Sequence, residues 1–409
     1  MEKDDGKEML EKRQQDYLYV LRKAVRGERL CRDRIADMEL ADVFFMAFPQ
    51  TQAALFYQCF LDSGYPLPKE LQSRCQKDLD QGIHRDALMN VERERIFDFM
   101  DKEKIWHCPL KGILLQELYP MLGLRFSSDN DILVDEKGRR RLKKFMKQRG
   151  YRVLNYGGSH HDAYVKEPSY HFEFHHRLLS RLLVGNAALR YFDRVEERLV
   201  PREGKPYLRE LTREDFYLHL VVHMYVHYAS TGTGLRGLVD LYYYLRSYPV
   251  DEAYVSARLA EFGMTDFETT VRSLGSKLFG EAASDAEGAF ADEQFAEDAF
   301  TESELTMLNY LFASGVSGNH TIYAQNMLEN CRKRSKTLRG AKLRYLWMRA
   351  FPNMEYYEMD YPFLYRHRVL IPFFLVYRLW KAMTTKRKLS TEFGVLMEAS
   401  EKGSCGKKN

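Results

Sequence analysis

The chain has 409 residues, enough for two or three domains with sizeable cores. Hydrophobic residues make up 45% of it and charged residues 29%, a composition that excludes a disordered or fibrous chain. The net charge of +4 is too small for this length to indicate nucleic-acid binding by itself. The six cysteines lie far apart with no CxxC pair, which excludes a dense disulfide framework and fits a reducing, cytoplasmic setting.

The first region of the chain is predicted to be helical. Helix-favouring residues dominate residues 8–104, apolar positions recur every three or four residues, and breaks fall at Pro49 and around Pro66. The N-terminus is charged from its second residue and lacks the apolar segment of a secretory signal. We therefore expect a helical N-terminal region over residues 1–104.

Short apolar runs that alternate with helical stretches begin at Ile105 and predict an α/β core over residues 105–200. Residues 201–409 return to a helical pattern, with one helix from Arg213 to Tyr228 and another from Leu235 to about Tyr248. The expected fold class is α+β. A small mixed β-sheet, with helices on one side, would stand between helical N-terminal and C-terminal regions.

A pair of aspartates at the start of a predicted strand is the most informative feature. Side chains alternate across a strand, so Asp129 and Asp131 project from one face and Asn130 from the other. Two carboxylates this close are costly unless a cation lies between them, and oxygen ligands on a rigid strand suit Mg²⁺. The pair indicates a phosphoryl-transfer site, whereas the alternative is two exposed acids of no chemical role, which are common at strand starts.

A third carboxylate comes from a later predicted strand. Strict alternation places Phe172 and Phe174 on one face, toward helices, and His171, Glu173 and His175 on the other. A third acid on a neighbouring strand is what a two-metal site needs to bind the catalytic ion and to act as general base toward a hydroxyl. The alternative is a half-exposed edge strand whose polar residues face solvent.

These features resemble the uncharacterised nucleotidyltransferase family of the DNA polymerase β-like superfamily. The likeness rests on Lys111-Gly112, on Asp129-Asn130-Asp131, and on the downstream stretch His223 to His227 with Arg236 and Asp240, and it covers most of the chain from about residue 90 onward. It implies transfer of an NMP group from ATP or another NTP to an acceptor hydroxyl, with release of pyrophosphate. The acids would hold two Mg²⁺ ions, with Mn²⁺ as an alternative. The catalytic and metal-binding residues implied are Asp129, Asp131 and Glu173, and the nucleotide-binding residues are Lys111, Gly112, Arg125, Ser128, His223, His227 and Arg236.

The phosphate contacts are expected to differ from those of the superfamily, because its usual Gly-Ser pair is Lys111-Gly112 here. Gly112 permits a close backbone approach, the helix predicted over Ile113 to Leu122 offers free N–H groups, and Lys111 supplies a point charge. Asn130 also replaces the apolar residue usually found between the two acids, which affects packing behind the strand but removes no ligand.

Three histidines share one face of a predicted helix, since His219, His223 and His227 recur at intervals of four. A polar stripe that contacts base, ribose or phosphate and buried structural histidines stay equal alternatives, and both are favoured over a zinc site, which lacks further ligands at recognisable spacing. Arg236 follows a Gly-rich break and is placed to clamp a triphosphate, although a local ion pair with Asp240 is the alternative.

The acceptor is expected to be a small molecule or a protein. Nucleic acid is not expected, because the acidic block from Glu281 to Glu304 would repel a polyanion and the basic blocks lack interleaved aromatic residues. A catalytically silent nucleotide-binding or regulatory protein of the same fold remains an alternative function.

No transmembrane segment is predicted, because the longest apolar stretch, Val369 to Trp380, is too short to span a bilayer. A buried core helix is favoured there. Over residues 361–388, aromatic residues lie beside basic ones, a composition that also suits a helix at a membrane surface. Peripheral membrane contact, as in a membrane-surface scaffold protein, is therefore the alternative.

Overall fold

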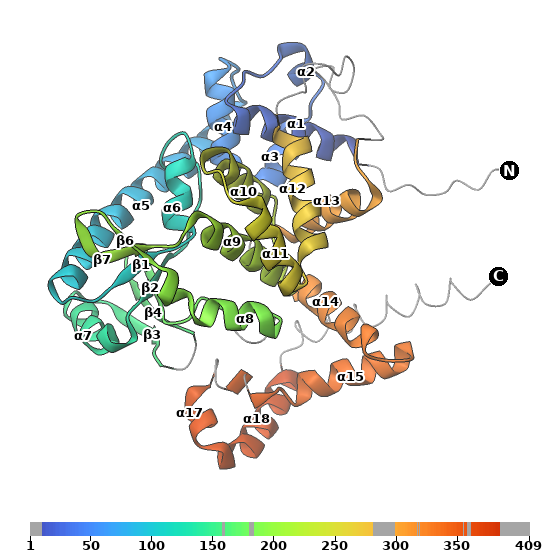
Figure 1. The fold of residues 1–409 in the computed structure, drawn as a ribbon. Coiled ribbons are helices and arrows are strands. Elements are labelled where there is room, and N and C mark those ends of the chain that lie inside the picture. Colours follow the sequence, from blue (N-terminus) through green and yellow to red (C-terminus); the bar gives the residue numbers. More distant parts are fainter. Residues whose placement is uncertain are drawn as a thin grey trace.

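The computed structural model describes residues 10–384 except 158–159, 180–183, 281–298, 317, 319, 355 and 358–360. In chain order, a seven-stranded mixed sheet follows a helical N-terminal region and precedes a helical C-terminal region, and helices of these two regions pack against each other (Figure 1). This arrangement confirms the expected α+β fold class. The proposed boundaries at residues 104 and 200 stay predictions, and the sheet itself continues to Glu210.

The N-terminal region is helical, with interruptions at the predicted prolines. One break contains Pro49 and the next contains Pro66, and Pro68 directly precedes the longest helix, which has 34 residues. Proline is tolerated between helices and directly before a helix, but not in a helix interior, because it lacks the backbone N–H that an interior residue donates. The helices are α1 (Lys12–Arg26), α2 (Arg32–Ala36), α3 (Leu40–Ala47), α4 (Ala53–Asp62) and α5 (Lys69–Lys102).

The sheet has the strand order β3-β4-β5-β2-β1-β7-β6. β2 pairs in parallel with β5 and antiparallel with β1, so these strands form the centre of the sheet. The strands are β1 (His107–Pro109), β2 (Asn130–Val134), β3 (Arg152–Asn155), β4 (His161–Lys166), β5 (Tyr170–His175), β6 (Val200–Arg202) and β7 (Lys205–Glu210).

The connection between β1 and β2 contains a shorter helix than its sequence pattern predicts. Helix α6 (Gly112–Leu115) is followed by the 3₁₀ turn η1 (Gln116–Leu118), and Tyr119 is extended. The predicted helix through Leu122 is therefore wrong in its second half. Tyr119 precedes Pro120, and the proline ring disfavours helical backbone at the residue before it.

One face of the sheet is covered by α5 and by α7 (Arg139–Gln148), which follows β2 and the 3₁₀ turn η2 (Glu136–Gly138). The predicted alternation on β5 is confirmed here, because Phe172 and Phe174 are both fully buried. They share one apolar cluster with side chains of β2, α5 and α7, including Ile132, Val134, Met89, Ile96, Phe97, Leu142 and Met146. The opposite face carries the acids and meets the helical regions through Leu133.

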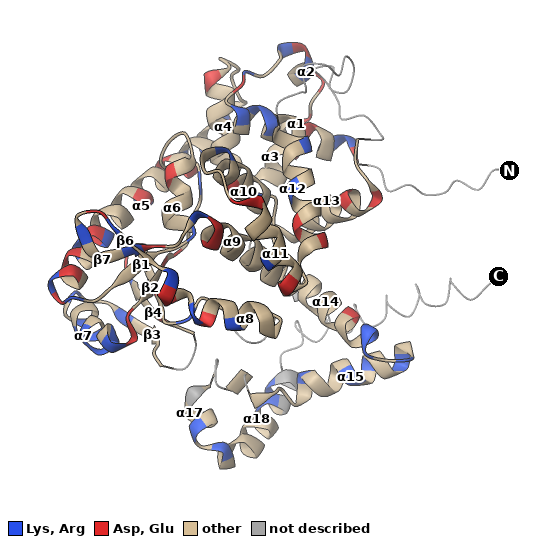
Figure 2. Ribbon diagram, in the orientation of Figure 1, with Lys and Arg blue, Asp and Glu red and all other residues tan. Residues whose placement is uncertain are grey.

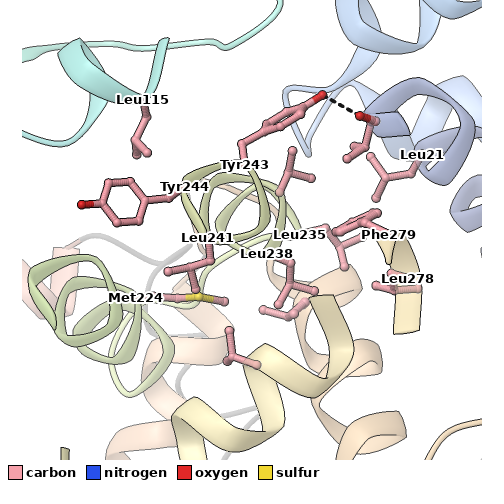
Figure 3. Packing of buried hydrophobic residues seen from close by; sticks show 14 of the residues in the cluster. Leu21, Leu115, Met224, Leu235, Leu238, Leu241, Tyr243, Tyr244, Leu278 and Phe279 are labelled. Carbon is pink, nitrogen blue, oxygen red and sulfur yellow. Dashed lines mark hydrogen bonds between the residues drawn. The ribbon is translucent and has the colours of Figure 1, made fainter. Parts of the chain in front are cut away.

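The C-terminal region contains the two helices predicted from the sequence, as α9 (Arg213–Tyr228) and α10 (Arg236–Ser247). Thr212 caps α9 by accepting a hydrogen bond from the Asp215 N–H. Leu238 of α10 and Leu235, directly before this helix, pack among buried residues that include Leu278 and Phe279 (Figure 3). The other elements are α8 (Asn186–Asp193), η3 (Val195–Arg198), α11 (Glu252–Phe262), α12 (Thr265–Phe279), α13 (Glu302–Ser314), α14 (His320–Lys333), α15 (Leu338–Ala350), α17 (Pro362–Arg366), η4 (Arg368–Leu370) and α18 (Ile371–Thr384).

Helix α18 is not the buried core helix expected over Val369 to Trp380. Val369 is 79% exposed, Phe373 74% and Val376 68%. Among the residues described, no helix combines the length and the apolar character required to span a bilayer. Residues 281–298 of the acidic block that was expected to repel nucleic acid lie outside the described residues.

Candidate active site

Asp131 and Glu173 face each other on neighbouring parallel strands. In the pairing of β2 with β5, these two residues are in register, and Asp129 directly precedes β2. Ligand atoms of Asp131, Glu173 and His175 lie within 4.8 Å of one another, as do those of Asp129, His171 and Glu173. The structure therefore brings together the three acids that alternation placed on one face.

Asp131 is stabilised as a carboxylate by two neighbours. The Lys111 ammonium lies 3.2 Å from its Oδ2, and His175 Nε2 lies 2.8 Å from its Oδ1. Burial of the carboxylate acts to raise the pKa of Asp131, but the Lys111 charge and the hydrogen bond from His175 hold this pKa well below its usual value. Asp131 is thus ionised at neutral pH.

The other two acids show the opposite effect. Burial together with the negative charges of Asp131 and Asp129 raises the pKa of Glu173 to about 8. Burial and the charge of Asp131 also raise the pKa of Asp129. Three acids in one pocket repel each other unless a cation lies between them, so their oxygen ligands and mutual repulsion fit a hard divalent ion such as Mg²⁺.

Gly112 closes one side of the site. A Cβ at this position would lie 2.6 Å from Ser127 Oγ, so any larger residue here would displace the Ser127 hydroxyl. The Ser127 hydroxyl in turn donates to the Asp129 carbonyl at 3.0 Å. Lys111, directly before Gly112, has a positive φ of 35° and directs its ammonium at Asp131. Lys111 therefore contacts Asp131 directly, and Gly112 packs against Ser127, which in turn donates to Asp129. Ser128 is exposed beside them.

Arg125 is engaged by Asp240 of α10. Two hydrogen bonds of 2.8 Å join its guanidinium to the carboxylate, and the Tyr119 hydroxyl donates to the same carboxylate at 2.9 Å. The local ion pair between Arg236 and Asp240, which the sequence left as an alternative, does not form. Arg236 instead donates to the Phe126 carbonyl at 2.8 Å. Arg236 is close enough for its charge to lower the pKa of Asp129, against the raising effect of burial and Asp131.

The three histidines of α9 have different surroundings. His223 and His227 contact each other through their Nε2 atoms at 3.1 Å, whereas His219 is fully buried and neither of its ring nitrogens has a hydrogen-bond partner among the described residues. Burial, with the nearby Lys111 charge, lowers the pKa of His227 to about 4 and that of His223 well below its usual value. These are neutral imidazoles, and within the described part of the chain the three do not group as metal ligands.

Sequence reasoning missed several residues of the site. Alternation placed His175 beside Glu173 but did not show that it contacts Asp131. His160 and His161 were not singled out, although two adjacent histidines at the start of a strand were a usable signal. Asn130, which departs from the usual pattern, is accommodated because its amide oxygen accepts from Arg93 of α5 at 2.9 Å.

Comparison with known proteins gives one match. The family described as uncharacterised nucleotidyltransferase matches residues 46–280, more than half of the chain. Searches of curated proteins and of solved structures each gave no significant match. The matched range contains every site residue described above.

Proposed function

The chain belongs to the uncharacterised nucleotidyltransferase family, and we propose that it transfers an NMP group from an NTP, such as ATP, to an acceptor hydroxyl with release of pyrophosphate. The observation that carries this proposal is the in-register placement of Asp131 and Glu173 on parallel strands, with Asp129 beside them. Two divalent cations, Mg²⁺ or Mn²⁺, would be held by these three acids.

The bound cations would neutralise the charge of the nucleotide's phosphates and of the developing transition state. Lys111 keeps Asp131 ionised and thereby ready to bind a cation. Glu173 is the proposed proton acceptor for the attacking hydroxyl, because its carboxylate lies beside those of Asp129 and Asp131, where the cations would bind. Fixed positions on two paired strands supply the orientation that in-line attack on the α-phosphate requires.

The remaining site residues are proposed to bind the nucleotide. Lys111 and Arg236 supply positive charge toward the phosphates, and His223 and His227 present neutral rings toward the base or ribose. Arg125 was expected to meet phosphate directly, and its pairing with Asp240 favours a role in positioning the loop before β2. Gly112 and Ser128 complete the proposed nucleotide-binding residues.

Binding is tested by the thermal stabilisation that each NTP with Mg²⁺ gives to the purified protein, since a ligand stabilises the native state that it binds. Asp129→Asn and Asp131→Asn should fold but lose this stabilisation. Asp98→Asn, an exposed acid on α5, is the matched control. Normal binding and transfer by both active-site variants would place the site elsewhere.

Transfer is tested by incubating the protein with each α-labelled NTP, Mg²⁺ and a cell extract. Label is expected in a small-molecule or protein fraction of the extract. Binding without any labelling would favour the silent nucleotide-binding alternative. Label in RNA, or RNA binding that weakens steeply with salt, would overturn the proposed acceptor class. The basic helix α7 makes this control necessary (Figure 2).

A second candidate function is contact with an anionic membrane surface from a cytoplasmic location. Phe363, Phe373 and Trp380 are more than half exposed, and Arg368 and Lys381 lie on the same short helical stretch. Apolar and basic side chains together suit the interface of an anionic bilayer. Sedimentation with vesicles containing phosphatidylserine should recover the protein, and Phe373→Ser with Trp380→Ser should abolish the recovery.

A further inference from the structure

Three histidines form a compact group at the edge of the acidic site. His161 and His175 are paired across the antiparallel strands β4 and β5, and His160 directly precedes β4. The ring centroids are 4.6 Å apart for His160 and His161, 5.4 Å for His160 and His175, and 5.2 Å for His161 and His175. One nitrogen of each ring lies within 4.8 Å of those of the other two.

His175 is oriented as metal-binding histidines usually are. Its Nε2 lies 2.8 Å from Asp131 Oδ1, and because an ionised carboxylate only accepts, this nitrogen carries the hydrogen. In the neutral ring the lone pair is then on Nδ1. A histidine ligand commonly donates its other N–H to a carboxylate in this way, which fixes the tautomer.

The Nδ1 atom of His175 is buried and has no hydrogen-bond partner in the part of the chain that the structure describes, and the side chain is only 4% exposed. A buried polar atom left without a partner destabilises the fold unless something binds it. This observation is independent of the ring distances and also points to a ligand.

The spacing of the other two rings fits a tetrahedral ion. His160 Nε2 and His161 Nδ1 lie 3.3 Å apart. Two nitrogens that each bind Zn²⁺ at its usual bond length in tetrahedral geometry lie about 3.3 Å apart. Imidazole nitrogens suit zinc and similar transition metals, whereas Mg²⁺ takes oxygen ligands, so this group and the three acids favour different ions.

We propose that His160, His161 and His175 form a zinc site beside the acidic site, with the fourth position open to water or a neighbouring group. The bound ion would hold the His175 ring and, through its hydrogen bond, the carboxylate of Asp131. His175 is thus the link between the two sites. The zinc site does not depend on nucleotidyl transfer, and it differs from the α9 histidines.

The test is a calorimetric titration of chelator-treated, full-length protein with Zn²⁺ in excess Mg²⁺, followed by a titration with Co²⁺ read by visible absorption. One equivalent of Zn²⁺ should bind, and Co²⁺ should give the absorption of a tetrahedral site with nitrogen ligands. His161→Ala and His160→Ala should each weaken Zn²⁺ binding by about tenfold or more, while His84→Ala, an exposed histidine on α5, should not.

Asp129→Asn separates this proposal from the proposed function, because it changes the acidic site and none of the three histidines. Zinc binding should persist in Asp129→Asn even where nucleotide binding is lost. His161→Gln, checked by circular dichroism, shows whether a loss of zinc comes from misfolding. No stoichiometric Zn²⁺, or Zn²⁺ lost in Asp129→Asn and kept in a folded His161→Gln, would overturn the proposal.

Discussion

Arg125 and Asp240 form a bidentate ion pair across 115 residues of sequence, with both nitrogen–oxygen distances at 2.8 Å. The side chains are only 6% and 11% exposed. Arg125 comes from the segment that leads into β2, and Asp240 comes from α10. This pair therefore joins the strand that carries the aspartates to the helical C-terminal region, and Tyr119 adds a third hydrogen bond to it.

Removing one member of this pair should be strongly destabilising. Asp240→Ala leaves the Arg125 guanidinium buried without its counter-ion, and we expect the free energy of unfolding to fall by about 3–5 kcal/mol. Urea denaturation followed by circular dichroism measures the loss. The double variant Arg125→Ala/Asp240→Ala should lose less than the sum of the two single losses, because the charges are removed together.

The control is the exposed ion pair between Arg194 and Glu197, whose side chains are 72% and 55% exposed. Its removal by Glu197→Ala should leave the free energy of unfolding nearly unchanged, because water and salt screen an exposed pair. Strict additivity for Arg125 and Asp240, or equal losses at the buried and exposed pairs, would contradict the role assigned to the buried pair.

Gly112→Ala should damage the site through Ser127. The added Cβ would lie 2.6 Å from Ser127 Oγ and 3.1 Å from Arg125 Nη1, so the Ser127 side chain must move and its hydrogen bond to the Asp129 carbonyl must weaken. We expect a loss of stability of about 1–3 kcal/mol and weaker nucleotide-dependent thermal stabilisation. Ser127→Ala removes the atom nearest to the added Cβ. The double variant Gly112→Ala/Ser127→Ala should therefore regain part of the stability and part of the nucleotide-dependent thermal stabilisation.

Gly275→Ala on α12 is the control for glycine replacement, because a Cβ there meets nothing within 4 Å. Alanine has the higher helix propensity, so this variant should be neutral or more stable by up to about 1 kcal/mol. A Gly112→Ala protein as stable as the control variant, or no gain from Ser127→Ala, would contradict the steric account.

Glu173→Gln should affect chemistry more than binding. The amide keeps the shape of the side chain but cannot accept a proton, and loss of a general base typically slows a reaction by about 100-fold or more. Single-turnover transfer of α-labelled NTP gives the rate, and thermal shift gives the binding. Glu167→Gln, in the exposed turn between β4 and β5, is the control. Equal losses of rate and binding would contradict the assignment.

Glu92 should make stability depend on pH at acid values. Its side chain is 2% exposed and accepts hydrogen bonds from Arg149 at 2.6 and 2.9 Å. Burial acts to raise the pKa of Glu92, but the bonds and charge of Arg149 outweigh it and lower this pKa below 4.5. A lowered pKa adds stability that is complete above the usual value and is lost as the pH falls through the folded-state value.

The free energies of unfolding of wild type and Glu92→Gln, measured by urea denaturation, should therefore differ most between about pH 6 and 7. The expected difference there is about 1–3 kcal/mol. The difference should narrow as the pH falls below 4.5. Glu94→Gln, an exposed neighbour, should parallel the wild type at every pH. A gap that is constant down to the most acid pH would exclude the ionisation of Glu92 as its cause.

The acids were predictable because a strand has a fixed alternation. Spacing alone placed Asp129 with Asp131 on one side of their strand and Glu173 opposite Phe172 and Phe174 on another, and the burial of these two phenylalanines follows this rule. Helix α9 was predictable in the same sense, since its cap, its periodicity and the break after it agree with one another.

Contacts between distant segments were not predictable. Local spacing placed Arg236 one turn from Asp240, yet Arg125 takes that carboxylate from another element. Periodicity likewise placed His219 and His227 on the same helix face and could not distinguish them. Tertiary packing alone determines that His219 is fully buried. Helix α18 differs for the same reason, because an apolar stretch does not show whether another element covers it.

The distance between the α-carbons of Asp131 and Glu173 is set by the pairing of their strands. Neighbouring strands lie about 4.7–4.9 Å apart, and residues in register cannot separate without breaking the hydrogen bonds between their strands. The main chains at these two positions therefore cannot move apart, and only the side-chain torsions can adjust to a larger ion. Substitutions around the pocket leave this backbone spacing unchanged, and only changes that shift β5 against β2 would alter it.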